Sequence, residues 1–233
     1  MRRFTDRAFV FLVGSSLAIY LSVSSVSSQG QPSSSLLQQD QRLSSDSNFA
    51  KLKLPLGVSV EVPKNWWIFD SDGNSTIETF AEATMNLSGI EIPNGKQITL
   101  FRANSMPRTT YAGIAIKLRE SELDPRILKS ASIEEINQFS SDIKQMTQEA
   151  LSAADLELIE FYGVRREFVG SHPALVIEYK RSGQKGAVIV QITRLFLRGK
   201  EMVLDLSYRE SEAKIWKPIV LYIRKSLSVV LDK

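Results

Sequence analysis

The chain has 233 residues, of which 43% are hydrophobic and 24% are charged, a composition typical of one globular domain with extensions. It contains 29 Lys and Arg against 26 Asp and Glu, and this net charge of +3 gives no reason to expect nucleic-acid binding. There is no cysteine, which excludes disulfides, thiol catalysis and lipid attachment through an N-terminal cysteine.

Residues 1–28 have the pattern of an export signal, with a positive start, an apolar run over 8–26 and small residues before Gln29. We predict cleavage near Gln29 and a periplasmic or extracellular protein. The alternative is an uncleaved membrane anchor through residues 8–26, because about 20 apolar residues can span a bilayer. The positive charges of this segment are Arg2, Arg3 and Arg7.

Residues 29–50 are rich in Ser, Gln and Asp and are predicted to be a flexible linker, because they offer too little apolar surface to fold. The folded domain is therefore expected over residues 51–233.

The domain opens with alternating Val58, Val60 and Val62, which predict a short strand ended by Pro63. The pair Trp66-Trp67 follows. We expect the pair to pack in the hydrophobic core, with one indole buried and the other nearer the rim, since aromatic residues mostly serve packing. The alternative is an exposed platform for a ligand.

Asp70–Asn74 is weakly similar to a calcium loop, but Ser75 and Ala81 stand where the loop needs Gly and Glu. We read it as a polar turn. With one histidine and no cysteine, zinc is not expected, and no glycine loop for phosphate is present. No metal or cofactor is therefore predicted.

The middle of the chain predicts a hairpin at Asn94-Gly95, between strands at 90–93 and 97–103, and a further strand at Tyr111–Leu118. Ser132 and Glu135 form a capping box that begins a surface helix. Its buried stripe is expected to contain Ile133, Ile136, Phe139, Ile143, Met146 and Ala150.

Residues 156–168 are expected to form one or two strands, and three strands joined by short glycine-containing turns follow at 174–180, 187–197 and 201–208. The second of the three is apolar on both sides in its first half, which indicates a central strand. The third alternates, which predicts one wetter face.

A closing helix is expected to have Pro218 in its first turn and an apolar stripe. The stripe residues are Ile215, Ile219, Ile223 and Leu227, widened by Val220 and Val230. These elements together predict an α+β fold.

Three groups of residues give the chain a resemblance to PsbP-like domains over about residues 54–230. They are the opening 57–63 with Trp66, the middle Gly170, Pro173-Ala174 and Tyr179, and the tail Leu206-Ser207-Tyr208 with Pro218 and Ser226. The resemblance implies an antiparallel sheet flanked by helices, an α-β-α sandwich. The superfamily includes the extrinsic photosystem II protein, a Ran-GTPase-binding transport factor and many exported bacterial proteins. It mostly contains binding or assembly factors and has no shared catalytic residues, so it does not define a function.

The charge distribution offers a candidate partner-binding surface. Residues 120–160 have ten acidic and three basic side chains, net −7, whereas residues 161–233 have fourteen basic and seven acidic, net +7. The candidate binding residues are Arg165, Arg166, Arg181 and Lys185. Further basic residues of the same region are Lys180, Arg194, Arg198 and Lys200, and Arg194 is expected at the rim. The alternative is that the two charged regions simply complement each other within the fold.

The sequence therefore predicts an exported, non-enzymatic binding or accessory domain at or near an envelope or membrane complex. The expected partner is an envelope protein, with an anionic membrane surface as a second option. The alternative is a hydrolase or small-ligand enzyme that uses His172, the single histidine, with a nearby Ser or Asp.

Overall fold

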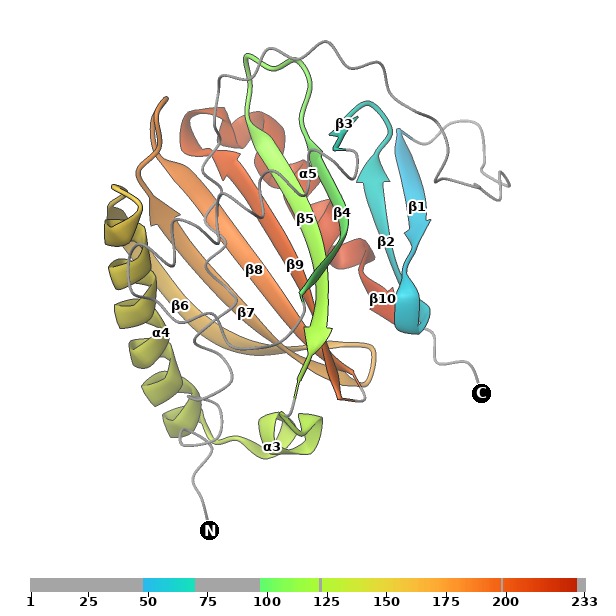
Figure 1. The fold of residues 1–233 in the computed structure, drawn as a ribbon, viewed down its shortest axis with the longest axis vertical. Coiled ribbons are helices and arrows are strands. Elements are labelled where there is room, and N and C mark those ends of the chain that lie inside the picture. The colour runs from blue at the N-terminus through green and yellow to red at the C-terminus, as the bar shows by residue number, and fades with distance from the viewer. Residues whose placement is uncertain (1–47, 70–96, 122, 198, 230–233) are drawn as a thin grey trace.

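The computed structural model describes residues 48–69, 97–121, 123–197 and 199–229. It contains a seven-stranded antiparallel sheet with the order β3-β4-β5-β9-β8-β7-β6 and a three-stranded antiparallel sheet with the order β1-β2-β10 (Figure 1). The strands are β1 (Phe49–Lys53), β2 (Val58–Pro63), β3 (Trp67–Ile68), β4 (Ile98–Asn104), β5 (Ala112–Glu120), β6 (Leu158–Val169), β7 (His172–Arg181), β8 (Val188–Leu197), β9 (Lys200–Arg209) and β10 (Ser228–Val229). The α-helices are α3 (Pro125–Ser130), α4 (Ile133–Ala153) and α5 (Ala213–Ser226).

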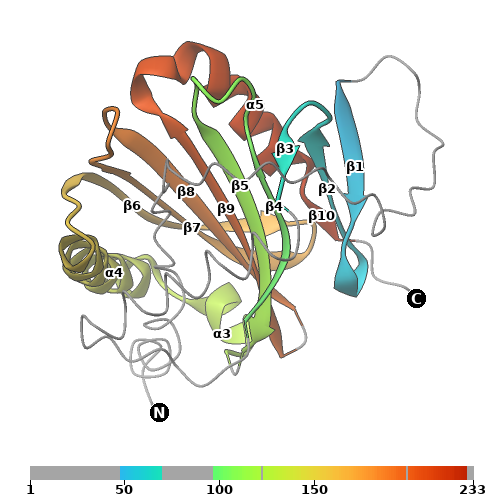
Figure 2. The same cartoon turned by 45° about the horizontal axis from the view of Figure 1, so that its top comes forward.

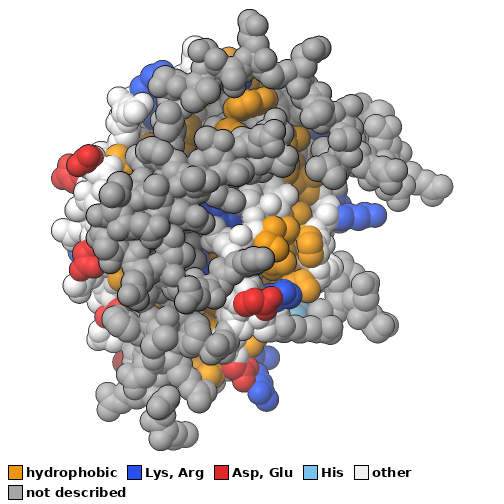
Figure 3. Space-filling view, in the orientation of Figure 1, with side chains coloured by type: hydrophobic (Ala, Val, Ile, Leu, Met, Phe, Trp, Pro, Cys, Tyr) orange, Lys and Arg blue, Asp and Glu red, His pale blue; other side chains and the backbone are white. Residues whose placement is uncertain are grey.

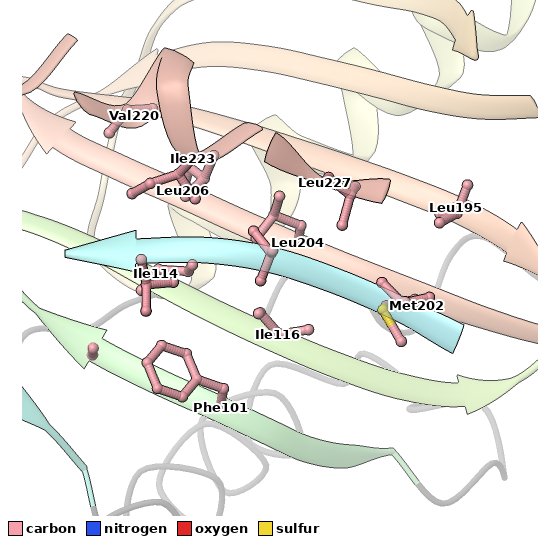
Figure 4. Close-up of a cluster of buried hydrophobic side chains, with 14 of the residues drawn as sticks. Phe101, Ile114, Ile116, Leu195, Met202, Leu204, Leu206, Val220, Ile223 and Leu227 are labelled. Atoms are coloured by element: carbon pink, nitrogen blue, oxygen red, sulfur yellow. The ribbon is translucent and has the colours of Figure 1, made fainter. Parts of the chain in front are cut away.

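The helices flank the large sheet, as predicted for an α+β sandwich. Helix α5 and the small sheet cover one face, and α4 with α3 lies on the other (Figures 1 and 2). The core under α5 joins side chains from β5, β9 and α5, among them Ile114, Leu204, Leu206 and Ile223 (Figure 4). A second core lies under α4 and is built around side chains such as Phe139. We refer to these sides as the α5 face and the α4 face.

The predicted run of three strands is confirmed as β7, β8 and β9, which are neighbours in the sheet. Gly186 and Gly199 in their turns have φ of 108° and 77°, which favours glycine. All ten residues of β8 are buried, as expected for a central strand. The wetter face predicted for β9 is wrong, because every residue from Glu201 to Tyr208 is buried.

Both long helices form where predicted, with differences at their ends. The capping box of Ser132 and Glu135 begins α4, but Ile133 in the first turn is exposed instead of joining the buried stripe. Helix α5 starts earlier than expected, so Pro218 is its sixth residue and lies outside the first turn. The buried stripe also differs from the predicted one, since Trp216 is buried and Ile215 is exposed.

Several predictions fall outside the described residues. They are the signal over 1–28, the linker apart from its last three residues, the turn at Asp70–Asn74, the strand at 90–93 with the hairpin turn at Asn94-Gly95, and the residues Arg198 and Val230. Strand β1 begins at Phe49, two residues before the expected domain boundary. The region 156–168 forms a single strand, β6, with two register shifts along its pairing with β7. Among the helices of the described ranges, none is both long and apolar enough to span a membrane.

Candidate functional site

The four basic residues predicted to bind a partner do not form one surface. Arg165 and Arg166 are neighbours on β6 and so point to opposite faces of the sheet. Arg165 donates to Glu167 at 2.7 Å and to Glu178 at 3.1 Å. Arg166 donates to three carbonyl oxygens at the end of α3, at 2.7 to 3.1 Å, and so satisfies groups that the helix leaves open.

Arg181 and Lys185 lie at the turn between β7 and β8. Arg165 lies further along the β6–β7 ladder, where it stands opposite Val176. Arg181 is only 4% exposed and donates to the carbonyl of Ser182 at 2.8 Å, so the expectation that it is a surface residue is wrong. Lys185 is exposed. This turn and the next one, which precedes Lys200, lie at opposite ends of the sheet, because the strands that they join are antiparallel.

A buried ionic cluster lies on the α4 face, and it corrects the expected position of Arg194 at the rim. Arg194 is fully buried and pairs with Glu201, which is 1% exposed. Glu201 Oε2 accepts from Arg119 Nε at 2.7 Å and from Arg194 Nη2 at 3.0 Å. Burial raises the pKa of Glu201 to about 7, and the positive charge of Arg119 acts in the opposite direction.

A second buried pair extends this cluster along the same face. Lys117 Nζ lies 3.5 Å from Asp205 Oδ2. Burial raises the pKa of Asp205, and Lys117 opposes the shift. Ser207 on the same side of β9 bonds to the hydroxyl of Tyr111 at 2.9 Å. The polar side chains of β9 on this face are therefore shielded from water, because charged side chains of β5 and β8 pair with its carboxylates.

The geometry of this ionic cluster fits a role in stabilising the fold better than a role in acting on a substrate. A carboxyl with a pKa near neutrality can exchange a proton at physiological pH. Glu201, however, is enclosed, and both of its oxygens accept hydrogen bonds from arginines. Arg119 stands directly opposite Glu201 in the β5–β9 register, and local sequence pattern did not predict this pairing.

Among the described residues, the fold gives His172 no catalytic partner. It begins β7 and stands opposite Val169 at the hairpin that follows β6. Within the described ranges, no Ser, Asp or Glu side chain is hydrogen-bonded to it. The same ranges contain no group of three or more His, Asp and Glu placed to bind a metal ion.

An exposed aromatic surface lies at the edge strand β3. Trp66 is 5% exposed and packs edge-on against Trp216, with 5.9 Å between ring centroids, so it is the buried member of the tryptophan pair, of which one indole was predicted to be buried. Trp67 is 43% exposed. Its ring lies 4.5 Å from that of Phe69, and the guanidinium of Arg108 lies 4.5 Å from its centroid. This is a cation–π stack at the surface.

Basic and apolar side chains surround this stack. Figure 3 shows hydrophobic side chains at the surface near the upper end of the molecule, with Lys or Arg side chains nearby. The exposed hydrophobic and basic residues that the β2–β3 turn, β3, the β4–β5 connection and the start of α5 contribute there are Lys64, Trp67, Ile68, Met106, Arg108, Lys214, Ile215 and Lys217. We call this set the docking end. Of its members, only Trp67 was considered from the sequence as part of a possible ligand platform, whereas Ile215 was expected in the buried stripe of the closing helix.

Comparison with known proteins shows the fold. No family model matches the sequence, and no curated protein sequence matches it. The solution structure of cyanobacterial PsbP (CyanoP) from Synechocystis sp. PCC 6803 is similar over 87% of this chain and 99% of that one, with a TM-score of 0.52 and 11% identity. LpqN of Mycobacterium tuberculosis, involved in cell envelope biogenesis, matches 79% of this chain and 93% of its own with a TM-score of 0.41 and 12% identity. The predicted PsbP-like fold is thereby confirmed.

Proposed function

We propose that this chain, a PsbP-like fold, is an exported accessory domain that acts by surface contact at the cell envelope and not by catalysis. The exposed stack of Trp67, Phe69 and Arg108 supports this proposal. Trp and Arg are enriched among the residues that dominate binding energy at interfaces. A stack whose members already hold one another also loses little conformational entropy when a partner binds.

The fold is compatible with this role. A PsbP-like fold hosts binding and assembly factors as well as proteins of unknown role, so the fold alone leaves the function open. Export is expected from residues 1–28, and the partner is therefore expected in the envelope. The hydrolase alternative depends on His172, which has no catalytic partner among the described residues.

Site-specific photo-crosslinking in cells tests the proposal with the full chain. A crosslinking residue at position 67 is expected to give envelope-associated products, whereas one at Lys144, exposed on α4, is expected to give none. Equal yields at both positions, or no product at position 67, would contradict the proposed role of the aromatic surface. A hydrolytic activity lost in His172→Ala would favour the enzyme instead.

A further inference from the structure

We propose that the docking end binds an anionic lipid surface, with its apolar side chains in the headgroup region and its basic side chains facing lipid phosphates. This inference rests on the proposed function and names the class of ligand. The alternative, a purely proteinaceous partner for the same residues, is an outcome of the test described below.

The docking end is held together by contacts between distant parts of the chain. The backbone N–H of Tyr111, beside the β4–β5 connection, donates to Glu212 Oε2 at 2.8 Å. The same oxygen accepts from Trp216 Nε1 at 3.0 Å, at the start of α5. Trp216 in turn packs against Trp66, which precedes β3. Figure 1 shows these segments together at the upper end of the molecule, so the exposed side chains sit on a fixed scaffold.

The apolar members of the docking end suit a membrane interface. Trp67, Ile68, Met106 and Ile215 are large hydrophobic residues exposed on one end of the molecule, and Ile215 is 55% exposed. Indole rings favour the boundary between headgroups and acyl chains, and Lys and Arg reach from such a boundary into the polar region. The combination is typical of surfaces that lie on a membrane without crossing it.

The charges of the docking end have one sign. Its members include four cations, Lys64, Arg108, Lys214 and Lys217, and no acid. The nearby carboxylates of Glu210 and Glu212 pair with Lys180 and Arg209. Asp155 and Glu157 are exposed near the β7–β8 turn on the β6 side, which limits the contact to the side formed by β3 and α5. Each cation near an anionic membrane contributes about fivefold to the binding constant.

The N-terminal segment joins the domain at this same end. The carbonyl of Asn48, the first described residue, accepts from the backbone N–H of Lys64 at 3.0 Å, three residues before Trp67. The sequence before it contains the apolar run 8–26, read as a signal or an anchor. An anchor there would attach the domain by the end that has the exposed tryptophan, and a tether raises the effective concentration of that end at the membrane.

Fluorescence quenching by lipids tests the inference on the full chain. Of the three tryptophans, Trp66 and Trp216 are buried, so quenching by bromine atoms on lipid acyl chains reports on Trp67. We expect quenching with brominated phosphatidylglycerol vesicles and much less with brominated phosphatidylcholine. High salt should reduce it, and Trp67→Phe should abolish it.

Charge neutralisation provides the matched comparison. Lys214→Gln with Lys217→Gln is expected to weaken lipid-dependent quenching about 30-fold, from about fivefold for each charge. Lys129→Gln with Lys144→Gln removes two exposed cations that lie on α3 and α4, and is expected to change nothing.

The possible results separate the inference from the proposed function. Absence of quenching, equal quenching in both lipids, or equal effects of the two lysine pairs would overturn the lipid inference. If position 67 crosslinks to a protein while no quenching is seen, the accessory role stands and the lipid ligand is wrong. If position 67 shows neither crosslinking nor quenching, both are wrong.

Discussion

Truncation of Trp66 to alanine is expected to destabilise the domain by about 3–5 kcal/mol, the usual range for a buried large aromatic residue. Trp66 is 5% exposed, so nearly all of its side chain leaves water on folding. Burial of about 200 Å² at about 25 cal/mol per Å² gives about 5 kcal/mol, an upper value because the unfolded chain is already partly compact. The edge-on contact with Trp216 adds about 1 kcal/mol, which alanine also loses.

Urea unfolding followed by circular dichroism measures this loss. With a slope of about 2 kcal/mol per molar urea, the midpoint should fall by about 2 M. Trp67→Ala is the matched control. The indole of Trp67 is 43% exposed, so its removal should lower the free energy of unfolding much less. The reasoning is refuted if the midpoint of Trp66→Ala is unchanged, or if the two substitutions cost the same.

Three further predictions follow from the charged residues. Arg194→Ala should cost about 3–5 kcal/mol in urea unfolding, because it takes one arginine from the buried Glu201; a loss below about 1 kcal/mol would contradict the pair. Partial burial acts to raise the pKa of Glu167, but its two arginine partners outweigh this effect and lower the pKa. The stability that this carboxylate contributes is therefore present above its unfolded pKa and is lost as the pH falls through its folded pKa. The stability difference between the parent and Glu167→Gln should therefore shrink below about pH 4, and a difference that does not change with pH would count against it. Arg181→Glu should destabilise the fold and Lys185→Glu should not, because only the first is buried; equal melting temperatures would disprove this.

Much of the α4-face core could not be predicted from alternation alone. Glu201 and Asp205 alternate with apolar residues on β9, and in a typical antiparallel sheet such a face meets water. Here the face is covered, and Arg119 and Lys117 on β5 neutralise the two carboxylates. The register that aligns Arg119 with Glu201 joins residues 82 positions apart, and a reading of local pattern has no access to it.

The sequence by itself determined the α+β class, the three consecutive strands and the capped helix α4, and it predicted that one indole of the Trp66-Trp67 pair is buried. The turns between the strands and the start of α4 depend on interactions within a few residues, such as the turn at Gly186 or the bond from Glu135 N–H to the Ser132 side chain. Only the tertiary structure decided which charged and aromatic side chains are buried and which are exposed. It buried Arg194 and assembled the docking end from β3, the β4–β5 connection and α5. The physical reason is that exposure depends on which distant segments pack on a side chain, and local periodicity does not contain that information.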